Sequence, residues 1–459
     1  GLLKRLRPEP CVVQGFDWNS HFLYNQKVLL TLSMALTYPK HHQIPTGFIS
    51  TCQICDSKKL HMVLDLGHQP LCDSLLTEKM LNEPEKTYPL RMVWCENCTG
   101  VQIDYCVDGS EVYYPDYPYK SGVTKELVEY QVNIGKSLIN KFSLQPGDLV
   151  VDVGSNDGTL LSGFKGTGIK TVGIEPTNIA KLANQAGIET VQAFFDIKTS
   201  EAVKEKYGLA SVVVTTNTFA HMQGLGEFIM GAYNLLKEGG VFVSETHYLL
   251  DAILGGQFDT IYHEHLRTYS LHSLAALFDQ YDFTVIDVER GERYGGNIRV
   301  YAEKGKGKKV NGSVSDLLQK EKEGGLDKLE TYLKFADRVK KARLEFLEFI
   351  VQTKKNGKTI VGNSCPGRSS TLLNYYGIDK ELLPYLAEQP ASLKLGMYLP
   401  GKHIPVVNNQ RLIDEQPDFV VLLAWHYAKP IMQQLKARGL KSDFIIPLPE
   451  FKVVKNSSI

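Results

Sequence analysis

A short apolar strand that breaks into glycines constrains the fold of this chain more than any other segment. Residues 149–160 read Leu-Val-Val-Asp-Val-Gly-Ser-Asn-Asp-Gly-Thr-Leu. This pattern is typical of a buried parallel strand that turns sharply into a helix, where bare backbone N–H groups can approach a ligand. A second apolar strand, residues 171–174, ends at Glu175, whose carboxylate can accept both hydroxyls of a ribose. The two strands together predict an adenosine site.

The spacing of the motif separates it from the dinucleotide-binding fold. That fold uses G-x-G-x-x-G to hold a pyrophosphate near a helix N-terminus. Here the pattern is Asp152-x-Gly154-x-x-x-Gly158, and Asp157 adds a second acid. These carboxylates would repel a pyrophosphate and suit a cationic amino-acid tail, so the motif predicts S-adenosylmethionine as the cofactor. The alternative is a glycine-rich turn of some other α/β protein.

Strand and helix patterns alternate along the middle of the chain, as a doubly wound α/β domain requires. A helix is expected at residues 125–142, before the first strand. Ligands of open α/β sheets bind outside the carboxyl ends of the strands, so the site should lie there. The strands are expected at residues 149–153, 171–174, 211–215, 241–245, 284–289 and 298–303.

Two C-x-x-C pairs mark the N-terminal part of the chain, Cys52 to Cys55 and Cys95 to Cys98. Each pair can present two thiolates to one tetrahedral Zn²⁺, and four protein ligands leave no open position for chemistry. The pairs therefore predict a structural zinc site; two disulfides are the alternative. The other cysteines are expected to be isolated thiols: Cys11, Cys72, Cys106 and Cys365.

A cluster of tyrosine and proline follows at residues 113–122. It is too rigid for a helix interior and too aromatic for an ordinary linker. Such a segment could cover a cleft, with ring faces toward a sulfonium cation. A packed connector is the other interpretation.

Two histidine sites follow strands of the central domain. His221 comes shortly after the strand at residues 211–215, where a side chain can face the methyl group of the cofactor. The second site is the run Tyr-His-Glu-His that ends at His265. It is not the zinc motif H-E-x-x-H, because position 267 is arginine. A structural histidine at the first site and a surface turn at the second are the alternatives.

Carbon methylation explains why such groups would be needed. A carbon nucleophile must be made by removing a proton beside a carbonyl, which takes a base and a partner for the oxyanion. We expect Glu264 to orient the ring of His265 and stabilise its protonated form, so that the dyad acts as a base near neutral pH. Tyr119, Tyr262 and His221 could hydrogen-bond the enolate oxygen.

Size and charge limit the class of protein. A chain of 459 residues should contain several domains. The formal net charge of zero argues against binding to nucleic acid. Because no apolar run reaches the roughly 20 residues of a membrane span, we expect a soluble, cytoplasmic protein, a monomer or a dimer, with a small-molecule substrate.

A set of motifs in order along residues 50–450 resembles the sugar C-methyltransferases, which methylate C3 of a nucleotide-linked 4-keto-deoxyhexose. The motifs are Cys52-x-x-Cys55, Leu64-Asp-Leu-Gly-His-Gln-Pro-Leu71, Cys95-Glu-Asn-Cys98, Tyr117-Pro-Tyr119, Val153-Gly-Ser-Asn-Asp-Gly-Thr-Leu-Leu161, Gly173-Ile-Glu-Pro176, Phe219-Ala-His221, Phe258-Asp-Thr-Ile-Tyr-His-Glu-His265, Gly295-Gly-Asn-Ile-Arg-Val-Tyr301, Leu372-Leu-Asn-Tyr375 and Tyr398-Leu-Pro-Gly-Lys-His-Ile-Pro405.

The resemblance implies a class I S-adenosylmethionine-dependent α/β domain between a zinc-binding module and a C-terminal Rossmann-like domain that holds the nucleotide. The expected domains are an N-terminal extension (1–45), the zinc-binding module (46–118), the methyltransferase domain (119–310), a helical connector (311–356) and the Rossmann-like domain (357–459). An O- or N-methyltransferase that acts on a sugar or another small molecule is the alternative.

The same resemblance implies roles for single residues. His265 would be the C3 base, paired with Glu264, and the sugar site would be lined by Tyr119, His221 and Tyr262. The cofactor-binding candidates are Asp152, Gly154, Ser155, Asn156, Asp157, Gly158, Glu175, Pro176 and Asn217. The substrate-binding candidates are Tyr117, Lys120, His263, Arg299, Arg368, Asn374 and Tyr398.

Two loops depart from the family. The C-terminal loop at residues 362–370 is poorer in alanine and glycine, and Gly122 stands where relatives tend to keep a serine. The loop still follows an expected strand and opens a helix, so its N–H groups and Arg368 could bind phosphate. Residues 313–355 read as an amphipathic helical segment that packs between domains. Further strands are expected at residues 359–362, 405–407, 419–423 and 444–447, and Trp425 could stack on a base or fill the core.

Overall fold

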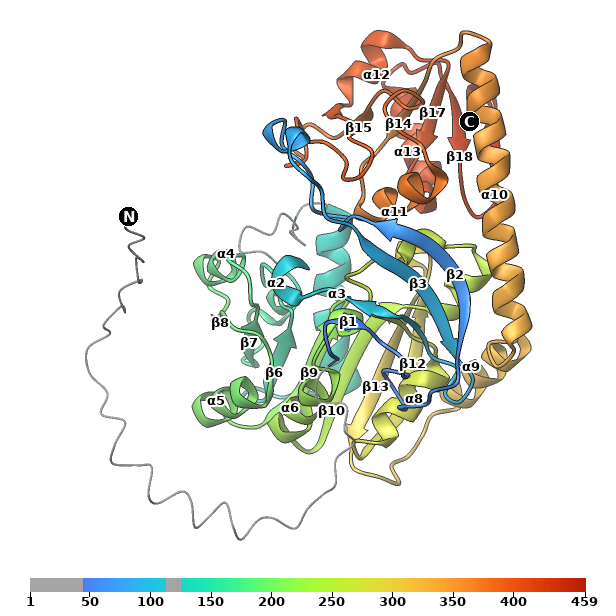
Figure 1. Ribbon diagram of the computed structural model, residues 1–459. Helices are drawn as coiled ribbons and strands as arrows, with labels where there is room; N and C mark the ends of the chain where they lie inside the picture. Colours follow the sequence, from blue (N-terminus) through green and yellow to red (C-terminus); the bar gives the residue numbers. More distant parts are fainter. Residues whose placement is uncertain (1–43, 113–121, 123–124) are drawn as a thin grey trace, which may run out of the picture. The chain divides into compact units, whose positions relative to one another are not determined.

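A seven-stranded sheet organises the middle of the chain, in the order β12-β13-β10-β9-β6-β7-β8 (Figure 1). The five strands from β6 to β10 run parallel, and β13 pairs antiparallel with both β10 and β12. The computed structural model describes residues 44–112, 122 and 125–459. The extension expected at 1–45 therefore lies almost wholly outside the described residues, as do Tyr117, Tyr119 and Lys120 of the tyrosine and proline cluster. The described residues form one compact unit.

The strands of this central module confirm the expectation from the apolar pattern. All five residues of β6 are buried, as a strand covered on both faces requires. The two-residue strand β8 was not predicted, because it is too short to show a period. The elements are α3 (Lys125–Lys141), β6 (Leu149–Val153), η3 (Leu161–Phe164), β7 (Lys170–Ile174), α4 (Ala180–Gln185), β8 (Thr190–Val191), α5 (Ile197–Tyr207), β9 (Ala210–Thr216), η4 (Phe219–His221), α6 (Leu225–Leu235), β10 (Leu236–His247), α7 (Leu249–Leu254), η5 (Phe258–Thr260), β11 (Arg267–Thr268), α8 (Leu271–Asp279), β12 (Phe283–Gly291), η6 (Arg293–Gly295) and β13 (Asn297–Lys304).

A four-stranded antiparallel sheet in the order β11-β4-β3-β2 forms the N-terminal module, and a small pair, β1 and β5, stands beside it. The edge strand β11 belongs to the central module by sequence, so this sheet joins the two modules through backbone hydrogen bonds. The remaining elements are β1 (Gly47–Phe48), β2 (Leu60–Gln69), η1 (Lys79–Asn82), β3 (Tyr88–Cys95), β4 (Val101–Ile103), β5 (Tyr105–Cys106) and α2 (Gly109–Val112).

The C-terminal module contains a six-stranded sheet in the order β16-β15-β14-β17-β18-β19. All neighbours are parallel except the last pair, as expected for a Rossmann-like domain. The predicted strands are confirmed, whereas β15 and β19, of three residues each, were not predicted. The elements are β14 (Ile360–Asn363), α11 (Gly367–Tyr376), β15 (Leu386–Glu388), β16 (Val406–Asn408), α12 (Gln410–Glu415), β17 (Phe419–Leu422), η7 (Trp425–Tyr427), α13 (Ala428–Ala437), β18 (Asp443–Ile446), β19 (Lys452–Val454) and η8 (Asn456–Ser458).

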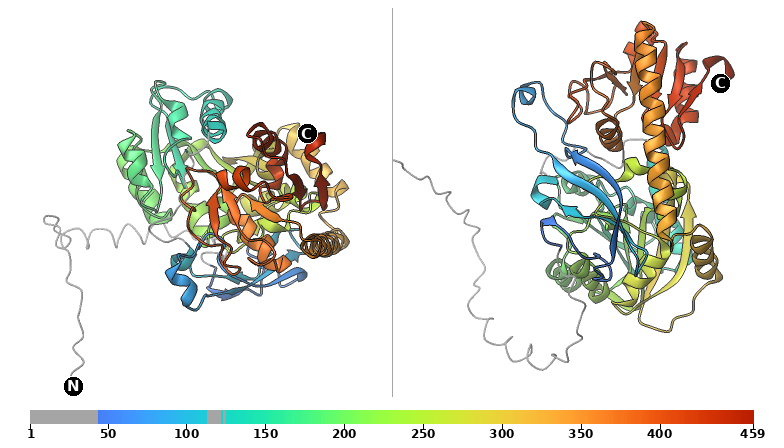
Figure 2. Two further views of the ribbon diagram at one scale, coloured as in Figure 1. Left: turned by 90° about the horizontal axis from the view of Figure 1, so that it is seen from above. Right: turned by 45° about the vertical axis from the view of Figure 1, so that its right-hand side comes forward.

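Two helices, α9 (Gly312–Glu323) and α10 (Leu329–Lys355), connect the central and C-terminal modules. The break between them includes Gly324 and Gly325, and Gly325 has a φ of +72°. The long helix α10 contacts β2, α7 and β14 and so touches all three modules; Figure 2 shows its length along one side of the unit. One such contact is between the rings of Trp94 and Tyr332, 5.3 Å apart. The predicted packing between domains is confirmed, while the predicted domain boundaries stay predictions.

Although α10 has 27 residues, charged side chains recur along it. Among the residues that the structure describes, no helix combines the length and the apolar character needed to cross a bilayer.

Candidate functional site

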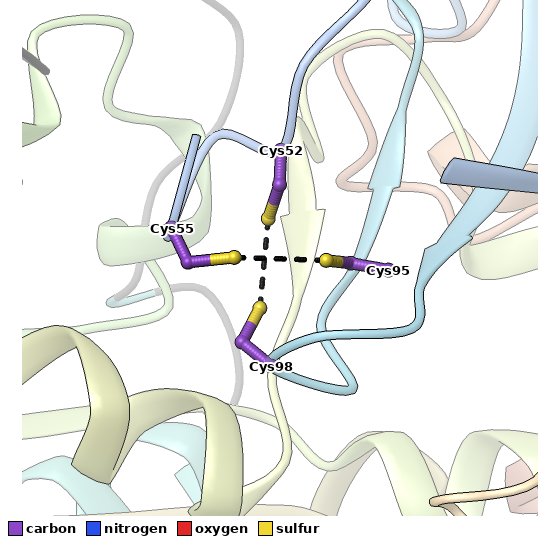
Figure 3. A group of neighbouring side chains, drawn as sticks. All are labelled: Cys52, Cys55, Cys95 and Cys98. Carbon is purple, nitrogen blue, oxygen red and sulfur yellow. Dashed lines mark hydrogen bonds between the residues drawn. The ribbon is translucent and has the colours of Figure 1, made fainter. Parts of the chain in front are cut away.

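The four cysteines of the two C-x-x-C pairs converge on one point (Figure 3). One pair comes from the turn before β2, and the other from the end of β3 and the turn after it. The sulfurs lie within 4.8 Å of one another. The distances are 3.5 Å between Cys52 Sγ and Cys98 Sγ and 3.6 Å between Cys55 Sγ and Cys95 Sγ. Four thiolates around a zinc ion at the usual Zn–S length would stand about 3.8 Å apart, so this group fits a tetrahedral Zn²⁺.

All four cysteines are free thiols in the structure, which does not support the two-disulfide alternative. Three further cysteines, Cys72, Cys106 and Cys365, are free thiols as expected. Cys11 lies outside the described residues.

The glycine-rich turn after β6 adopts the sharp conformation that its sequence indicates. Gly154 and Gly158 have φ values of +76° and +78°. A Cβ on Gly154 would lie 2.5 Å from Oγ1 of Thr218, so the backbone comes close to the loop after β9 at this point. Asn156, between the two glycines, also has a positive φ of 50°. The turn lies at the carboxyl end of the sheet, but its N–H groups are not bare as predicted, because those of Gly154 and Ser155 donate to the Ile174 carbonyl and that of Gly158 donates to the Ser155 carbonyl.

Three polar atoms near this turn are buried without a hydrogen-bond partner in the described part of the chain. They are Oδ1 of Asp152, Oγ of Ser155 and Oδ1 of Asn217. Buried polar groups in folded proteins are nearly always satisfied, so such a cluster is what a ligand site leaves behind when its ligand is absent. The cofactor-binding role predicted for these residues is consistent with the geometry and stays a prediction.

The acids of the motif differ in their surroundings. Burial, and to a lesser extent the Glu175 charge, together raise the pKa of Asp152 to about 8. Glu175 Oε2 accepts a hydrogen bond from Asn156 N at 3.0 Å, and its Oε1 accepts from Thr177 N at 2.9 Å. Asp157 Oδ2 accepts from Gly122 N at 2.7 Å. Glu175 thus ties the two predicted loops together, with Pro176 directly after it at the end of β7.

His265 lies in a buried cluster with its two ring nitrogens occupied. Nδ1 is 2.8 Å from the Thr260 carbonyl, and Nε2 is 2.8 Å from Tyr262 Oη. A carbonyl can only accept, so Nδ1 carries the proton and Nε2 presents a lone pair to the phenol. The rings of His221 and His247 each lie 5.0 Å from the ring of His265. The structure therefore brings the predicted His221, Tyr262 and His265 together at the ends of β9 and β10.

Burial keeps these imidazoles neutral. It lowers the pKa of His265 to about 4, and it lowers the pKa of His221 and of His247 well below the ordinary value of 6.5. A neutral imidazole is the form that can accept a proton, but a pKa of about 4 lies below the near-neutral range predicted for the dyad. The prediction was wrong on this point, because burial disfavours the charged ring and the ring nitrogens bond Thr260 and Tyr262 instead of Glu264.

The surroundings of Glu264 differ from the expected dyad. Its Oε1 lies 3.7 Å from Cys72 Sγ, and its carboxylate groups with Cys72 and Asp73. The ring of His265 is held by a backbone carbonyl and a phenol, so Glu264 does not provide the orienting contact that the sequence analysis assigned to it. The reason is local: a single 3₁₀ turn, η5, places the Thr260 carbonyl within hydrogen-bond distance of Nδ1.

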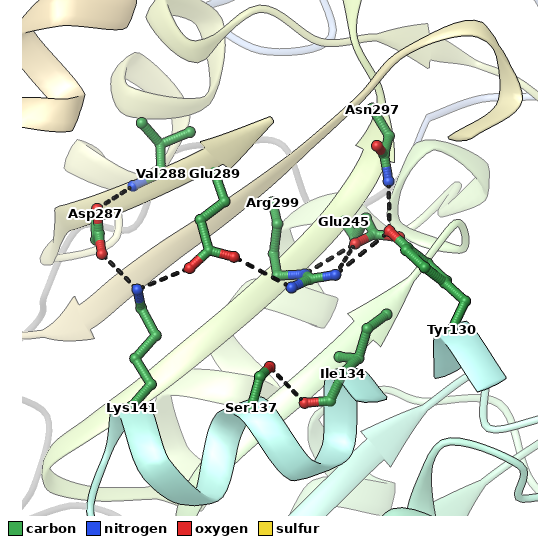
Figure 4. A network of polar contacts seen from close by, with 10 residues as sticks. All are labelled: Tyr130, Ile134, Ser137, Lys141, Glu245, Asp287, Val288, Glu289, Asn297 and Arg299. Carbon is green, nitrogen blue, oxygen red and sulfur yellow. Dashed lines mark hydrogen bonds and ion pairs between the residues drawn. The ribbon is translucent and has the colours of Figure 1, made fainter. Parts of the chain in front are cut away.

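Two substrate candidates of the central module are engaged within the protein. Nε2 of His263 is 3.2 Å from the carbonyl of Pro89 in β3. Arg299 in β13 donates from Nε and Nη2 to Glu245 at 2.8 and 2.6 Å, and Nη1 lies 3.3 Å from Glu289 (Figure 4). Tyr130 of α3 donates to the same Glu245 at 2.8 Å. These contacts explain both side chains as structural groups, and the predicted substrate roles stay predictions.

The candidates of the C-terminal module are also partnered. Arg368 pairs with Asp259 of η5 instead of standing free in its loop, so the geometry gives no support to the phosphate role expected for it. Nδ2 of Asn374 donates to the Pro400 carbonyl at 3.0 Å. Tyr398 forms a backbone bridge with Leu76 of the N-terminal module. Of the remaining candidates, Tyr117, Tyr119 and Lys120 lie outside the described residues.

Sequence reasoning missed two residues of this region. His247 is the last residue of β10, and its position after an apolar strand was the same signal that singled out His221. Asp259 lies within a quoted motif but was given no role; it is fully buried and accepts a hydrogen bond from Trp425 Nε1 at 2.8 Å. The Nε1 group of Trp425 therefore faces η5 of the central module, and its stacking on a base stays a prediction.

Comparison with known proteins places each module. Residues 52–113 match a zinc binding domain, residues 129–288 match a methyltransferase domain, and residues 292–449 match a C-methyltransferase C-terminal domain. Together with the fold, these matches define a methyltransferase with an N-terminal zinc-binding module. Over 414 residues the chain is 31% identical to C-methyltransferase NovU of Streptomyces niveus, which covers 89% of this chain and 98% of that protein. The chain belongs to this C-methyltransferase family.

Solved structures resemble only part of the chain. Magnesium protoporphyrin IX methyltransferase from Synechocystis PCC 6803, with bound SAH, shares 13% identity at a TM-score of 0.32 over 40% of this chain and 90% of its own. The YcgJ protein of Bacillus subtilis shares 13% identity at a TM-score of 0.31 over 39% of this chain and all of its own.

Proposed function

We propose that this protein is an S-adenosylmethionine-dependent C-methyltransferase whose substrate is a nucleotide-linked 4-keto-deoxysugar. The observation that carries the proposal is His265, a buried neutral imidazole whose Nδ1 donates to Thr260 and whose Nε2 has a lone pair for a proton. It lies beside the carboxyl ends of the parallel strands, the edge at which ligands of such sheets bind.

The residues at the glycine turn support the identity of the methyl donor. S-adenosylmethionine supplies an electrophilic methyl group on a sulfonium cation. The unsatisfied atoms of Asp152, Ser155 and Asn217 offer acceptors and donors to its polar parts. The buried carboxyl of Asp152 gains an opposite charge when a cation binds nearby, which favours its ionised form.

The chemistry of the base follows from the tautomer. His265 Nε2 would take the proton from the C–H bond beside the ketone, and the electron pair of that bond would form the enolate. S-adenosylmethionine, when bound, would supply the electrophilic methyl group for this carbon, with S-adenosylhomocysteine as the leaving group. Tyr262 Oη is 2.8 Å from Nε2 in the structure and would be free to donate to the developing oxygen once Nε2 takes the proton. The proposed products are the C-methylated keto sugar and S-adenosylhomocysteine, with a proton left on His265 for solvent.

The deprotonation step, which does not need the cofactor, provides the test. Incubation of the enzyme with nucleotide-linked keto-deoxyhexoses in D₂O, without cofactor, should give deuterium at the carbon beside the ketone. Labelled S-adenosylmethionine should then transfer its methyl group to that carbon. An O- or N-methyltransferase would methylate without prior exchange, and that result would contradict the proposal.

Variants separate the base from the fold. His265→Ala should abolish both exchange and transfer while sparing cofactor binding. His272→Ala removes an exposed histidine of the same module and serves as the matched control, with activity expected to be unchanged.

A further inference from the structure

A buried ion pair joins the C-terminal module to the turn that holds His265. Arg368, near the start of α11, donates from Nε and Nη2 to the two carboxylate oxygens of Asp259 at 2.8 and 2.6 Å. The Asp259 side chain is 0% exposed and the Arg368 side chain 8%. Trp425 of η7 donates to the same carboxylate. Both oxygens of Asp259 are therefore held by the C-terminal module.

Other contacts of α11 hold the neighbouring residues of the same turn. The ring of Phe258 stacks on that of Tyr376 with centroids 5.5 Å apart. Oγ1 of Thr371 donates to the carbonyl of Ile261 at 3.2 Å. Helix α11 thus contacts the residue before Asp259, Asp259 itself and a residue after it.

The turn reaches the imidazole through a single backbone group. The carbonyl of Thr260, the residue after Asp259, accepts the hydrogen bond from His265 Nδ1. The position of this carbonyl decides which ring nitrogen carries the proton, because the other nitrogen faces the hydroxyl of Tyr262. A rotation of η5 would release Nδ1 and allow the opposite tautomer.

We infer that Asp259 and Arg368 are positioning residues for the proposed base: by locking η5 they fix the Thr260 carbonyl, and with it the orientation and tautomer of His265. This inference rests on the proposed function. It predicts that loosening the ion pair lowers kcat more than it raises KM, because the substrate still binds while the base is misaligned.

The charges around His265 make the pH profile of kcat a readout that a purely structural role would not change. The groups that face its ring, or act on it through their charge, are His221, His247, Tyr262, Arg368 and Asp73. The Arg368 charge lowers the pKa of His265, and Asp259 offsets that charge at short range. Removal of the Asp259 charge should therefore move the acid limb of the kcat profile to lower pH.

The test uses the full-length protein with Asp259→Asn, with the double variant Asp259→Asn/Arg368→Met, and with Trp425→Phe. The ¹⁵N shifts of the His265 ring, assigned by their loss in His265→Ala, report the tautomer without substrate. We expect the Nδ1–H form in the unaltered protein and a mixed or reversed tautomer in Asp259→Asn, with kcat at least ten-fold lower.

The double variant separates positioning from stability. With both buried charges removed the melting temperature should recover, whereas kcat and the tautomer should not. Trp425→Phe removes one hydrogen bond to Asp259 and keeps the ion pair, so it should change the tautomer and kcat in the same direction but by less. It replaces Asp259→Asn in the test if that variant does not fold. The control is Asp104→Asn, which breaks the Arg91–Asp104 pair of the N-terminal module and should lower the melting temperature alone.

The inference is overturned if the double variant regains full kcat together with stability, or if every variant retains the Nδ1–H tautomer. Because the tautomer is read without substrate, absence of methyl transfer in the unaltered protein would count against the proposed function and not against this inference.

Discussion

Tyr262 Oη and His265 Nε2 lie 2.8 Å apart, with ring centroids at 3.9 Å, within the histidine cluster. Burial raises the pKa of Tyr262 well above its usual value of 10, so the phenol remains a hydrogen-bond donor at every working pH. The tyrosine thus covers the lone pair of the proposed base until the substrate enters.

Replacing Tyr262 by phenylalanine should separate its two contributions. The ring remains against His265, but the donor is lost, and loss of one donor to an oxyanion typically costs about 10²-fold in kcat. We expect that loss in Tyr262→Phe with little change in cofactor affinity, measured by steady-state kinetics and by cofactor titration.

The matched control is Tyr281→Phe, since the buried hydroxyl of Tyr281 has no hydrogen-bond partner within the described residues. Its kcat should stay within about two-fold of that of the unaltered enzyme, because Tyr281 has no role in the proposed reaction. Equal activity of Tyr262→Phe and Tyr281→Phe would remove Tyr262 from the mechanism.

The sequence predicted the sheets well and the site only in part. Long apolar strands such as β6 and β9 were located to within a residue, because burial on both faces leaves a continuous signal. Strands of two or three residues, such as β8 and β15, carry no period and were missed.

The site escaped prediction where it depends on backbone groups or on distant segments. The sequence offered Glu264 as the partner of His265 because it is adjacent, whereas the structure uses the Thr260 carbonyl, which no side-chain pattern reveals. The pairing of Arg368 with Asp259 joins segments 109 residues apart, so a loop arginine that looked free for phosphate is buried.

Asp152 gives the protein a measurable pH dependence. Its pKa is about 8 in the folded protein, because of burial and then the Glu175 charge, against about 3.9 in an unfolded chain. Between these values the folded protein binds more protons than the unfolded chain, so the free energy of unfolding falls as pH rises from about 4 to about 8.

Removing the ionisable group should flatten that slope. Asp152→Asn is expected to be more stable than the unaltered protein at pH 8 and about equally stable at pH 4, by urea unfolding at both values. The same variant should bind S-adenosylmethionine more weakly at pH 8, because the carboxylate that would pair with the cation is gone. A variant that unfolds with the same pH slope as the unaltered protein would contradict the shifted pKa.

The four-cysteine group should support the fold of the N-terminal module. Cys52→Ser is expected to lose bound zinc, measured by a colorimetric release assay, and to lower the melting temperature, since binding of a structural metal contributes directly to folding. Cys106→Ser alters a buried thiol outside the group and should retain zinc. Retention of one zinc per chain in Cys52→Ser would show that the metal is held elsewhere.

Arg299 provides the sharpest test between a structural and a substrate role. Its guanidinium pairs with Glu245, whose side chain is 1% exposed, so Arg299→Met should leave a buried carboxylate without its counter-charge at a cost of about 3–5 kcal/mol. Lys308→Met breaks the more exposed pair with Glu303 at the end of the same strand and should cost under about 1 kcal/mol. Urea unfolding of both variants measures these costs. The substrate KM of Arg299→Met, if this variant folds, tests whether Arg299 binds the substrate. A raised KM at unchanged stability would support a substrate-binding role for Arg299. Because Tyr130 and Arg299 both donate to Glu245, we expect lowered stability at unchanged KM.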